Sequence, residues 1–91
     1  MSKVVKKVEI KNKLGVHARA AALLVQTANK FSAQITFSAD GQSTDGRSSL
    51  GVMSLGVSQG SKIQIEAIGD DAEKAAKALE MLIDARFNEG E

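Results

Sequence analysis

Apolar residues near the end of the chain recur at helical spacing and fix the first element of the fold. They form one i, i+3, i+4, i+7 stripe: Ala72, Ala75, Ala76, Leu79, Leu82 and Ile83. Asp70 and Asp71 precede the stripe, where negative charge complements the positive end of a helix dipole. The segment just before, 62–68, alternates apolar and polar residues as a strand does. A one-faced helix after a half-buried strand indicates an α+β fold.

Earlier segments extend this pattern to the whole chain. The segment 3–10 is an imperfectly patterned strand, since Lys6 interrupts the face of Val4, Val8 and Ile10. Asp40-Gly41 is a turn signal between two short strands, and the weaker of these belongs at a sheet edge. The predicted order is β-α-β-β-α-β-α, with strands at 3–10, 34–38, 42–45 and 62–68 and helices at 18–30, 48–55 and 72–83.

Composition limits the classes of protein that the chain can belong to. Its 91 residues make one domain, 1–91, for which we expect 3–87 to be ordered and 88–91 to be a frayed acidic tail. No Cys and a single His exclude disulfides and histidine or thiolate metal sites. A net charge of +1, with three Phe and no Tyr or Trp, argues against nucleic-acid binding. No apolar run suits a signal peptide or a membrane span, so we expect a cytoplasmic protein.

The only histidine lies where a lysine-rich segment gives way to an alanine-rich run. If a helix begins just after His17, the N–H groups of Ala18, Arg19 and Ala20 lack intrahelical acceptors and the helix dipole favours an anion there. A neutral imidazole, with an ordinary pKa of about 6.5, is nucleophilic near neutral pH. His17 is therefore a candidate to accept a phosphoryl group. The alternative is an ordinary surface or half-buried histidine.

Two segments carry a resemblance to a known family. Lys13-Leu14-Gly15-Val16-His17-Ala18-Arg19-Ala20-Ala21 resembles the active-site signature of the histidine-containing phosphocarrier (HPr) family of the bacterial phosphotransferase system. Arg47-Ser48-Ser49-Leu50-Gly51-Val52-Met53-Ser54-Leu55-Gly56 resembles the regulatory-serine region of the same family. The resemblance extends over about 3–87. It implies an open-faced sandwich, in which three helices cover one face of a four-stranded antiparallel sheet.

The resemblance also implies a function. A carrier of this family is a substrate of enzymes and not itself an enzyme, and it needs no metal or cofactor. It accepts phosphate from phosphorylated Enzyme I, derived from phosphoenolpyruvate, and donates it to an enzyme IIA type acceptor. The phosphoryl group is expected on Nδ1 of His17 with Arg19 as the accompanying cation. Residues two apart on a regular helix do not face each other, so this arrangement requires His17 at the helix cap.

By motif position Ser48 corresponds to the regulatory serine, which implies a kinase of the HPr kinase/phosphorylase type and a transcriptional regulator as further partners. Its alternative role is that of a helix N-cap. Ser49 departs from the apolar residue usual beside that serine. The protein is expected to be a monomer whose partner-binding patch draws on seven residues: Ala21, Leu24, Arg47, Leu50, Gly51, Met53 and Leu55.

Ala20 also departs from the family, where proline is usual. Alanine restores an N–H and loosens the helix start, so we expect an altered rate or selectivity of transfer. The segment 10–15 looks like the nitrogen-related variant of the family, whereas 50–56 looks like carriers regulated at serine. The alternative function is therefore a regulatory adaptor, of nitrogen-branch or catabolite-control type, that acts by phosphorylation-dependent binding. An αβ binding module that is never phosphorylated is a third.

Overall fold

The computed structural model describes residues 2–89 and has the predicted order of strands and helices, with one addition at the end. Its elements are β1 (Ser2–Glu9), α1 (Ala18–Ala28), β2 (Gln34–Ala39), β3 (Gln42–Asp45), α2 (Ser49–Ser54), β4 (Lys62–Gly69), α3 (Ala72–Asp84) and the short turn η1 (Arg86–Asn88). The first helix ends at Ala28, two residues earlier than expected, because Asn29 closes it as the C-cap.

The four strands form one antiparallel sheet in the order β1-β4-β2-β3. The last strand in sequence is thus central, and β3 lies at an edge, as predicted. Strand β1 pairs along its length with β4, from Ser2 opposite Gly69 to Glu9 opposite Lys62. Asp40 and Gly41 have φ values of 51° and 80°, which are the left-handed values that a tight hairpin turn requires.

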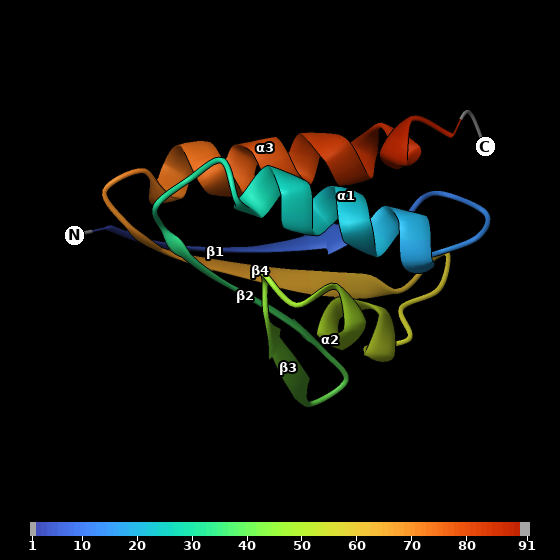
Figure 1. The fold of residues 1–91 in the computed structure, drawn as a ribbon. Coiled ribbons are helices and arrows are strands. Elements are labelled where there is room, and N and C mark those ends of the chain that lie inside the picture. Colours follow the sequence, from blue (N-terminus) through green and yellow to red (C-terminus); the bar gives the residue numbers. More distant parts are fainter. Residues whose placement is uncertain (1, 90–91) are drawn as a thin grey trace.

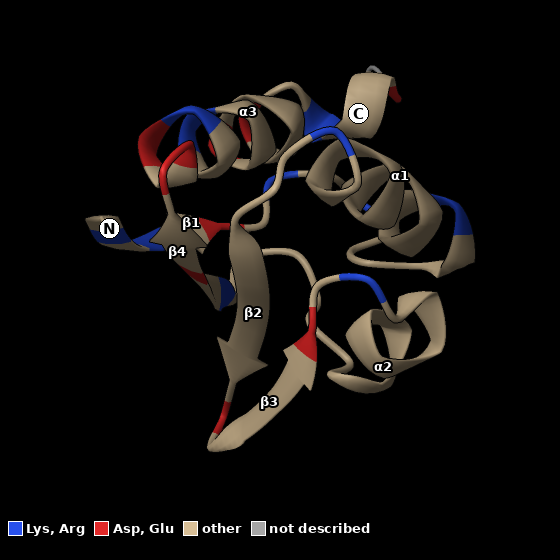
Figure 2. Ribbon diagram, turned by 60° about the vertical axis from the view of Figure 1, so that its left-hand side comes forward, with Lys and Arg blue, Asp and Glu red and all other residues tan. Residues whose placement is uncertain are grey.

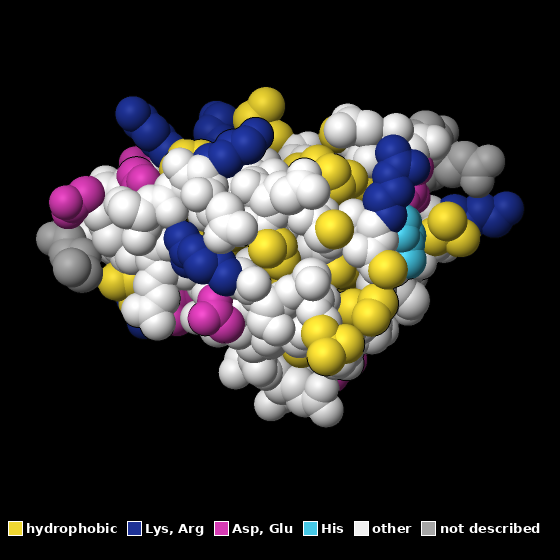
Figure 3. All heavy atoms as spheres, viewed as in Figure 1, with side chains coloured by type: hydrophobic (Ala, Val, Ile, Leu, Met, Phe, Trp, Pro, Cys, Tyr) yellow, Lys and Arg dark blue, Asp and Glu magenta, His cyan; other side chains and the backbone are white. Residues whose placement is uncertain are grey.

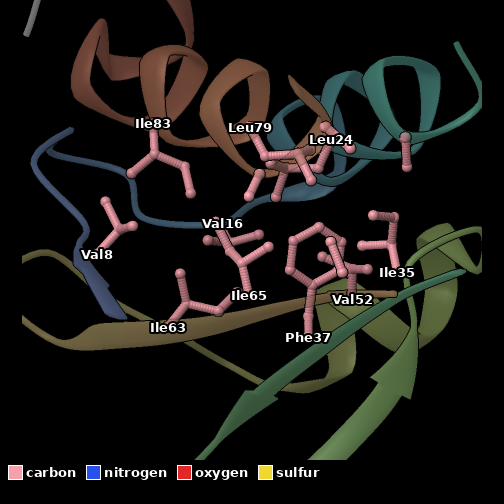
Figure 4. Packing of buried hydrophobic residues seen from close by; sticks show 14 of the residues in the cluster. Val8, Val16, Leu24, Ile35, Phe37, Val52, Ile63, Ile65, Leu79 and Ile83 are labelled. Atoms are coloured by element: carbon pink, nitrogen blue, oxygen red, sulfur yellow. The ribbon is translucent and has the colours of Figure 1, made fainter. Parts of the chain in front are cut away.

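All three helices lie on one face of the sheet and leave the other face open. Helices α1 and α3 lie side by side over the strands, and α2 packs between α1 and β3 (Figure 1). The core between these layers is apolar. It includes Phe37 and Ile35 from β2, Ile63 and Ile65 from β4, and Leu24, Val52, Leu79 and Ile83 from the helices (Figure 4). This packing confirms the predicted open-faced sandwich.

The end of the chain corrects the expectation of a frayed tail. Phe87 is fully buried and anchors η1 to the body of the protein. Asn88 lies in this turn, and Glu89 is partly buried with side-chain contacts to the rest of the chain. Burial of one large aromatic ring outweighs the fraying expected of a polar terminus. Gly90 and Glu91, the rest of the expected tail, lie outside the described residues.

Within residues 2–89, none of the helices has the length and hydrophobicity that a bilayer crossing demands.

Candidate functional site

The loop before α1 is held in a tight conformation that leads directly to His17. Gly15 has a φ of 68°, and a Cβ atom at this position would lie 2.7 Å from the Val57 carbonyl oxygen. The next residue, Val16, donates its N–H to that same carbonyl at 2.9 Å. Only glycine fits this combination of a left-handed φ and a close backbone neighbour. The α2–β4 connection therefore fixes where α1 starts.

His17 is the N-cap of α1, as the expected arrangement requires. Its backbone is extended, with φ −82° and ψ −178°, and its carbonyl accepts the first helical hydrogen bond, from the Ala21 N–H, at 2.9 Å. The ring turns back over the first turn, so that Nδ1 faces the Ala20 N–H at 3.4 Å. Nδ1 thus lies at the positive end of the helix, whose first-turn N–H groups include those of Ala18 and Arg19.

The other ring nitrogen contacts a carboxylate from the far end of the chain. Nε2 of His17 forms a hydrogen bond with Oε2 of Glu89. The second oxygen, Oε1, accepts a hydrogen bond from Asn12 Nδ2 at 3.0 Å. Asn12 is fully buried and also donates to the Gly15 carbonyl at 2.7 Å. The hydrogen bond with His17, supported by that from Asn12 and by the nearby Arg19 charge, lowers the pKa of Glu89 even though burial raises it.

The His17 side chain lines a shallow pocket of about 440 Å³. The other residues of the pocket are Lys13, Leu14, Arg19 and Glu89. Figure 3 shows the histidine ring at the surface, in cyan, with basic and hydrophobic side chains around it. About a quarter of the His17 side chain, 26%, is exposed. Two cations border the pocket, which suits an incoming phosphate, and Leu14, 71% exposed, gives it an apolar rim.

Helix α2 presents an uncharged surface with two large apolar side chains exposed on it. It carries no charged residue, as Figure 2 shows, and Leu50 and Met53 are 70% and 38% exposed. Ser48 is its N-cap, and Oγ accepts the Gly51 N–H at 3.0 Å. Gly51 faces inward, since a side chain there would overlap Thr44 of β3. The capping role of Ser48 is therefore confirmed, whatever further role it has.

Three residues of the expected partner patch lie apart from the exposed surface of α2, and a fourth, Gly51, faces β3. Ala21 and Leu24 are buried, because they lie on the face of α1 that packs on the sheet. They belong to the core and cannot contact a partner. The Arg47 guanidinium turns toward the end of α1, where it donates to the carbonyls of Phe31 at 2.8 Å and Ala33 at 3.3 Å. The surface part of the patch consists of Leu50 and Met53, with Leu55 half-buried beside them.

Asn12 and Glu89 are site residues that the sequence analysis missed. Asn12 stands in a polar loop and carries no motif of its own. Glu89 lies 72 residues from His17 along the chain, in a segment expected to be frayed. The one available signal was Phe87, an isolated large apolar residue just after α3, whose burial brings Glu89 back to the site.

Comparison with known proteins agrees with this geometry. The family model described as "PTS HPr component phosphorylation site" matches residues 4–85. A sandwich with a histidine capping the first helix defines a class of phosphoryl carriers. The chain belongs to the HPr family of the phosphotransferase system, whose members are phosphocarrier proteins.

Individual relatives are similar over nearly the whole chain. The phosphocarrier protein HPr of Xylella fastidiosa (strain Temecula1) is 45% identical over 80 residues, covering 88% of this chain and 90% of that protein. The phosphocarrier protein NPr of Shewanella violacea is 39% identical over 89 residues, covering 98% of each. The crystal structure of HPr-C-His from Thermoanaerobacter tengcongensis matches with a TM-score of 0.87 and 53% identity, covering 98% of each chain.

Proposed function

We propose that the protein carries a phosphoryl group on Nδ1 of His17. It accepts the group from phosphorylated Enzyme I, with phosphoenolpyruvate as the original donor, and passes it to an enzyme IIA type acceptor. One observation carries the proposal: His17 caps α1 with Nδ1 facing the N–H of Ala20 at the positive end of the helix. Backbone donors and the dipole there stabilise a phosphate covalently held on the ring.

Charge and exposure support reversible transfer. Arg19 and Lys13 border the pocket and attract the phosphate, while the ring stays open to solvent on one side. Leu50 and Met53 offer an uncharged docking surface on α2. Such a surface suits successive partners of different sequence, because methionine adapts its shape to each. We propose that the carrier acts in the cytoplasm as a monomer, which sedimentation at micromolar concentration tests.

The experiment is incubation with phosphoenolpyruvate and a cognate Enzyme I, followed by mass spectrometry of the intact protein. One phosphate is expected, stable in alkali and lost in acid, since phosphohistidine is acid-labile. His17→Ala should take up no phosphate, and Ser48→Ala should take up as much as the wild type. A phosphate retained by His17→Ala, or none on the wild type, would overturn the assignment.

A second function is carried by Ser48, whose hydroxyl caps α2 beside Leu50. We propose that phosphorylation of Ser48, by a kinase of the HPr kinase/phosphorylase type, controls which partners bind this surface. A transcriptional regulator is one candidate partner. The protein would then act as an adaptor, in line with its similarity to a relative named NPr as well as to HPr proteins. Incubation with such a kinase and ATP should give an acid-stable phosphate that Ser48→Ala lacks.

A further inference from the structure

The chain after α3 adopts an unusual conformation just before it reaches the site. Arg86, Phe87 and Asn88 have consecutive φ values of 55°, 52° and 63°. Residues other than glycine avoid this left-handed region, and a run of three persists only where the surroundings hold it. Buried Phe87 supplies that hold. The outcome of the turn is that the Glu89 carboxylate lies against the His17 ring.

Both oxygens of the Glu89 carboxylate are engaged. Oε2 contacts His17 Nε2, and Oε1 accepts a hydrogen bond from Asn12 at 3.0 Å. Asn12 is itself fixed by burial and by its bond to the Gly15 carbonyl. The carboxylate is thus oriented by a group that is part of the same loop as His17. Only 12% of the Glu89 side chain is exposed.

We propose that Glu89 is a positioning residue that selects the reactive nitrogen of His17. An ionised carboxylate only accepts hydrogen bonds, so Nε2 must carry the ring proton. In the neutral ring the lone pair is then on Nδ1, which faces the Ala20 N–H at the start of α1. Asn12 keeps the carboxylate in place, as an outer partner orients the histidine of a metal site or a catalytic triad. The inference deepens the proposed function and rests on it.

The transfer step balances without exchange of a proton with solvent. The Nδ1 lone pair forms the N–P bond while the bond from phosphorus to the donor's leaving atom breaks, and that electron pair stays with the donor. The proton remains on Nε2. The ring gains positive charge, which the Glu89 carboxylate stabilises. In the reverse direction the N–P bond breaks, its electron pair returns to Nδ1 and the phosphoryl group passes to the acceptor's nucleophile.

The carboxylate does not occupy the phosphate position. Glu89 contacts Nε2, whereas the phosphoryl group would be on Nδ1, at the opposite side of the ring. The charged groups around the ring are Glu89, Lys13 and Arg19, which line the same pocket. Lys13 and Arg19 are thus available to bind the phosphate, while the Glu89 carboxylate is hydrogen-bonded to the ring.

The test measures the tautomer and the kinetics separately. Nitrogen-15 NMR of the unphosphorylated neutral ring should show the Nε2–H form in the wild type and a larger share of the Nδ1–H form in Glu89→Ala, where only the Ala20 N–H still favours a lone pair on Nδ1. Glu89→Gln keeps an acceptor oxygen without the charge and should largely restore the Nε2–H form. Asp40→Asn removes a carboxylate from the exposed β2–β3 turn and should behave as the wild type.

Kinetics with phosphorylated Enzyme I provide the second readout. For Glu89→Ala we expect kcat to fall about tenfold with KM little changed, as for the loss of an outer-shell partner. Glu89→Gln should fall between this variant and the wild type. An unchanged tautomer and rate in Glu89→Ala would overturn the inference. Absence of phosphate on wild-type His17 would instead overturn the proposed function, and the NMR result would still decide the role of Glu89.

Discussion

Ala20 has a backbone N–H group at a position where the resemblance to the family implies a proline. That N–H faces Nδ1 of His17 at 3.4 Å. A hydrogen bond to the lone pair of a nucleophile stabilises the resting state and must weaken before the lone pair attacks phosphorus. The Ala20 N–H therefore has a partner. It affects the reactivity of Nδ1 as well as the stability of the fold.

Ala20→Pro should accept phosphate about two- to threefold faster, which corresponds to loss of a net hydrogen bond of about 0.5 kcal/mol. The fold should be kept, with stability within about 1 kcal/mol of the wild type, because this first-turn N–H needs no helical acceptor. Rapid-quench kinetics and urea unfolding provide the measurements. Ala20→Gly, which keeps the N–H, is the control. Slower transfer or strong destabilisation of the proline variant would show that the N–H is needed.

Between elements, two side chains bind backbone groups of the α1–β2 connection. Arg47, after β3, donates to carbonyls just beyond the end of α1. Asp71, at the start of α3, accepts the N–H groups of Ser32 and Ala33, each at 2.8 Å. The expected role of Asp71 was to complement the dipole of its own helix. Asp71 is the N-cap of α3, so its charge does lie at the start of that helix, and its side chain also closes the α1–β2 connection.

Arg47→Ala should lower the free energy of unfolding, because the hydrogen bonds to these carbonyls are lost. The loss should be only about 1 kcal/mol, because water can replace the guanidinium at exposed carbonyls. Arg47→Lys keeps the charge but not the planar set of donors, so it should recover only part of the loss. Lys30→Ala removes another exposed cation near the end of α1 and is the control. Urea unfolding measures all three, and equal losses for Arg47→Ala and Lys30→Ala would contradict the capping role.

Asp71 makes stability depend on pH. The backbone N–H groups of Ser32 and Ala33 lower its pKa from an ordinary value of 3.8. A lowered folded pKa means that the contribution is complete above about pH 3.8 and is lost as the pH falls through the folded value.

Asp71→Asn should therefore be less stable than the wild type at pH 6, with the gap closing in acid. Asp70→Asn removes the neighbouring exposed carboxylate and should change this dependence less. Unfolding curves measured from about pH 2.5 to about pH 7 test this dependence. If the difference in stability between Asp71→Asn and the wild type were constant across that range, the charge of Asp71 would have no part in its contribution.

On the scale of the whole molecule, the start of α1, which His17 caps, and helix α2 are far apart in sequence yet lie at the same end of the sandwich (Figure 1). Helix α1 packs against α2. A charge introduced at the start of α2 therefore acts on partners that must also reach His17.

Ser48→Asp should stay folded, because aspartate caps helices as well as serine. Its charge beside Leu50 should raise the KM for phosphorylated Enzyme I by about tenfold, equivalent to about 1.4 kcal/mol of binding, and added salt should reduce the effect. Steady-state kinetics at several salt concentrations test it. Ser43→Asp adds the same charge on the exposed edge strand and should leave KM unchanged. Equal kinetics for both variants would leave Ser48 as a cap alone.

Most of the fold was predictable because its information is local. Alternation identified the strands, the 72–83 stripe identified α3, and Asp40-Gly41 marked a turn in which both residues have a positive φ. The site was predictable only where it follows the chain, at the His17 cap and at Ser48. Burial of Ala21 and Leu24 was readable from the sequence, since these residues recur with Ala28 at helical spacing. The hydrogen bonds from Arg47 to the end of α1 and the return of Glu89 depend on tertiary structure, and no spacing in the sequence indicates them.

The strand order has a consequence for how the chain assembles. Strand β4 lies between β1 and β2, so neither gains its central neighbour until residue 69 has been made. During synthesis β1 has no partner strand until β4, about sixty residues later in the sequence, has been made. Sheets closed by such distant pairing fold late and all at once. Charged side chains on an unpaired strand disfavour its pairing with other chains. The lysines at 3, 6 and 7 therefore protect β1 from aggregation before the sheet has formed.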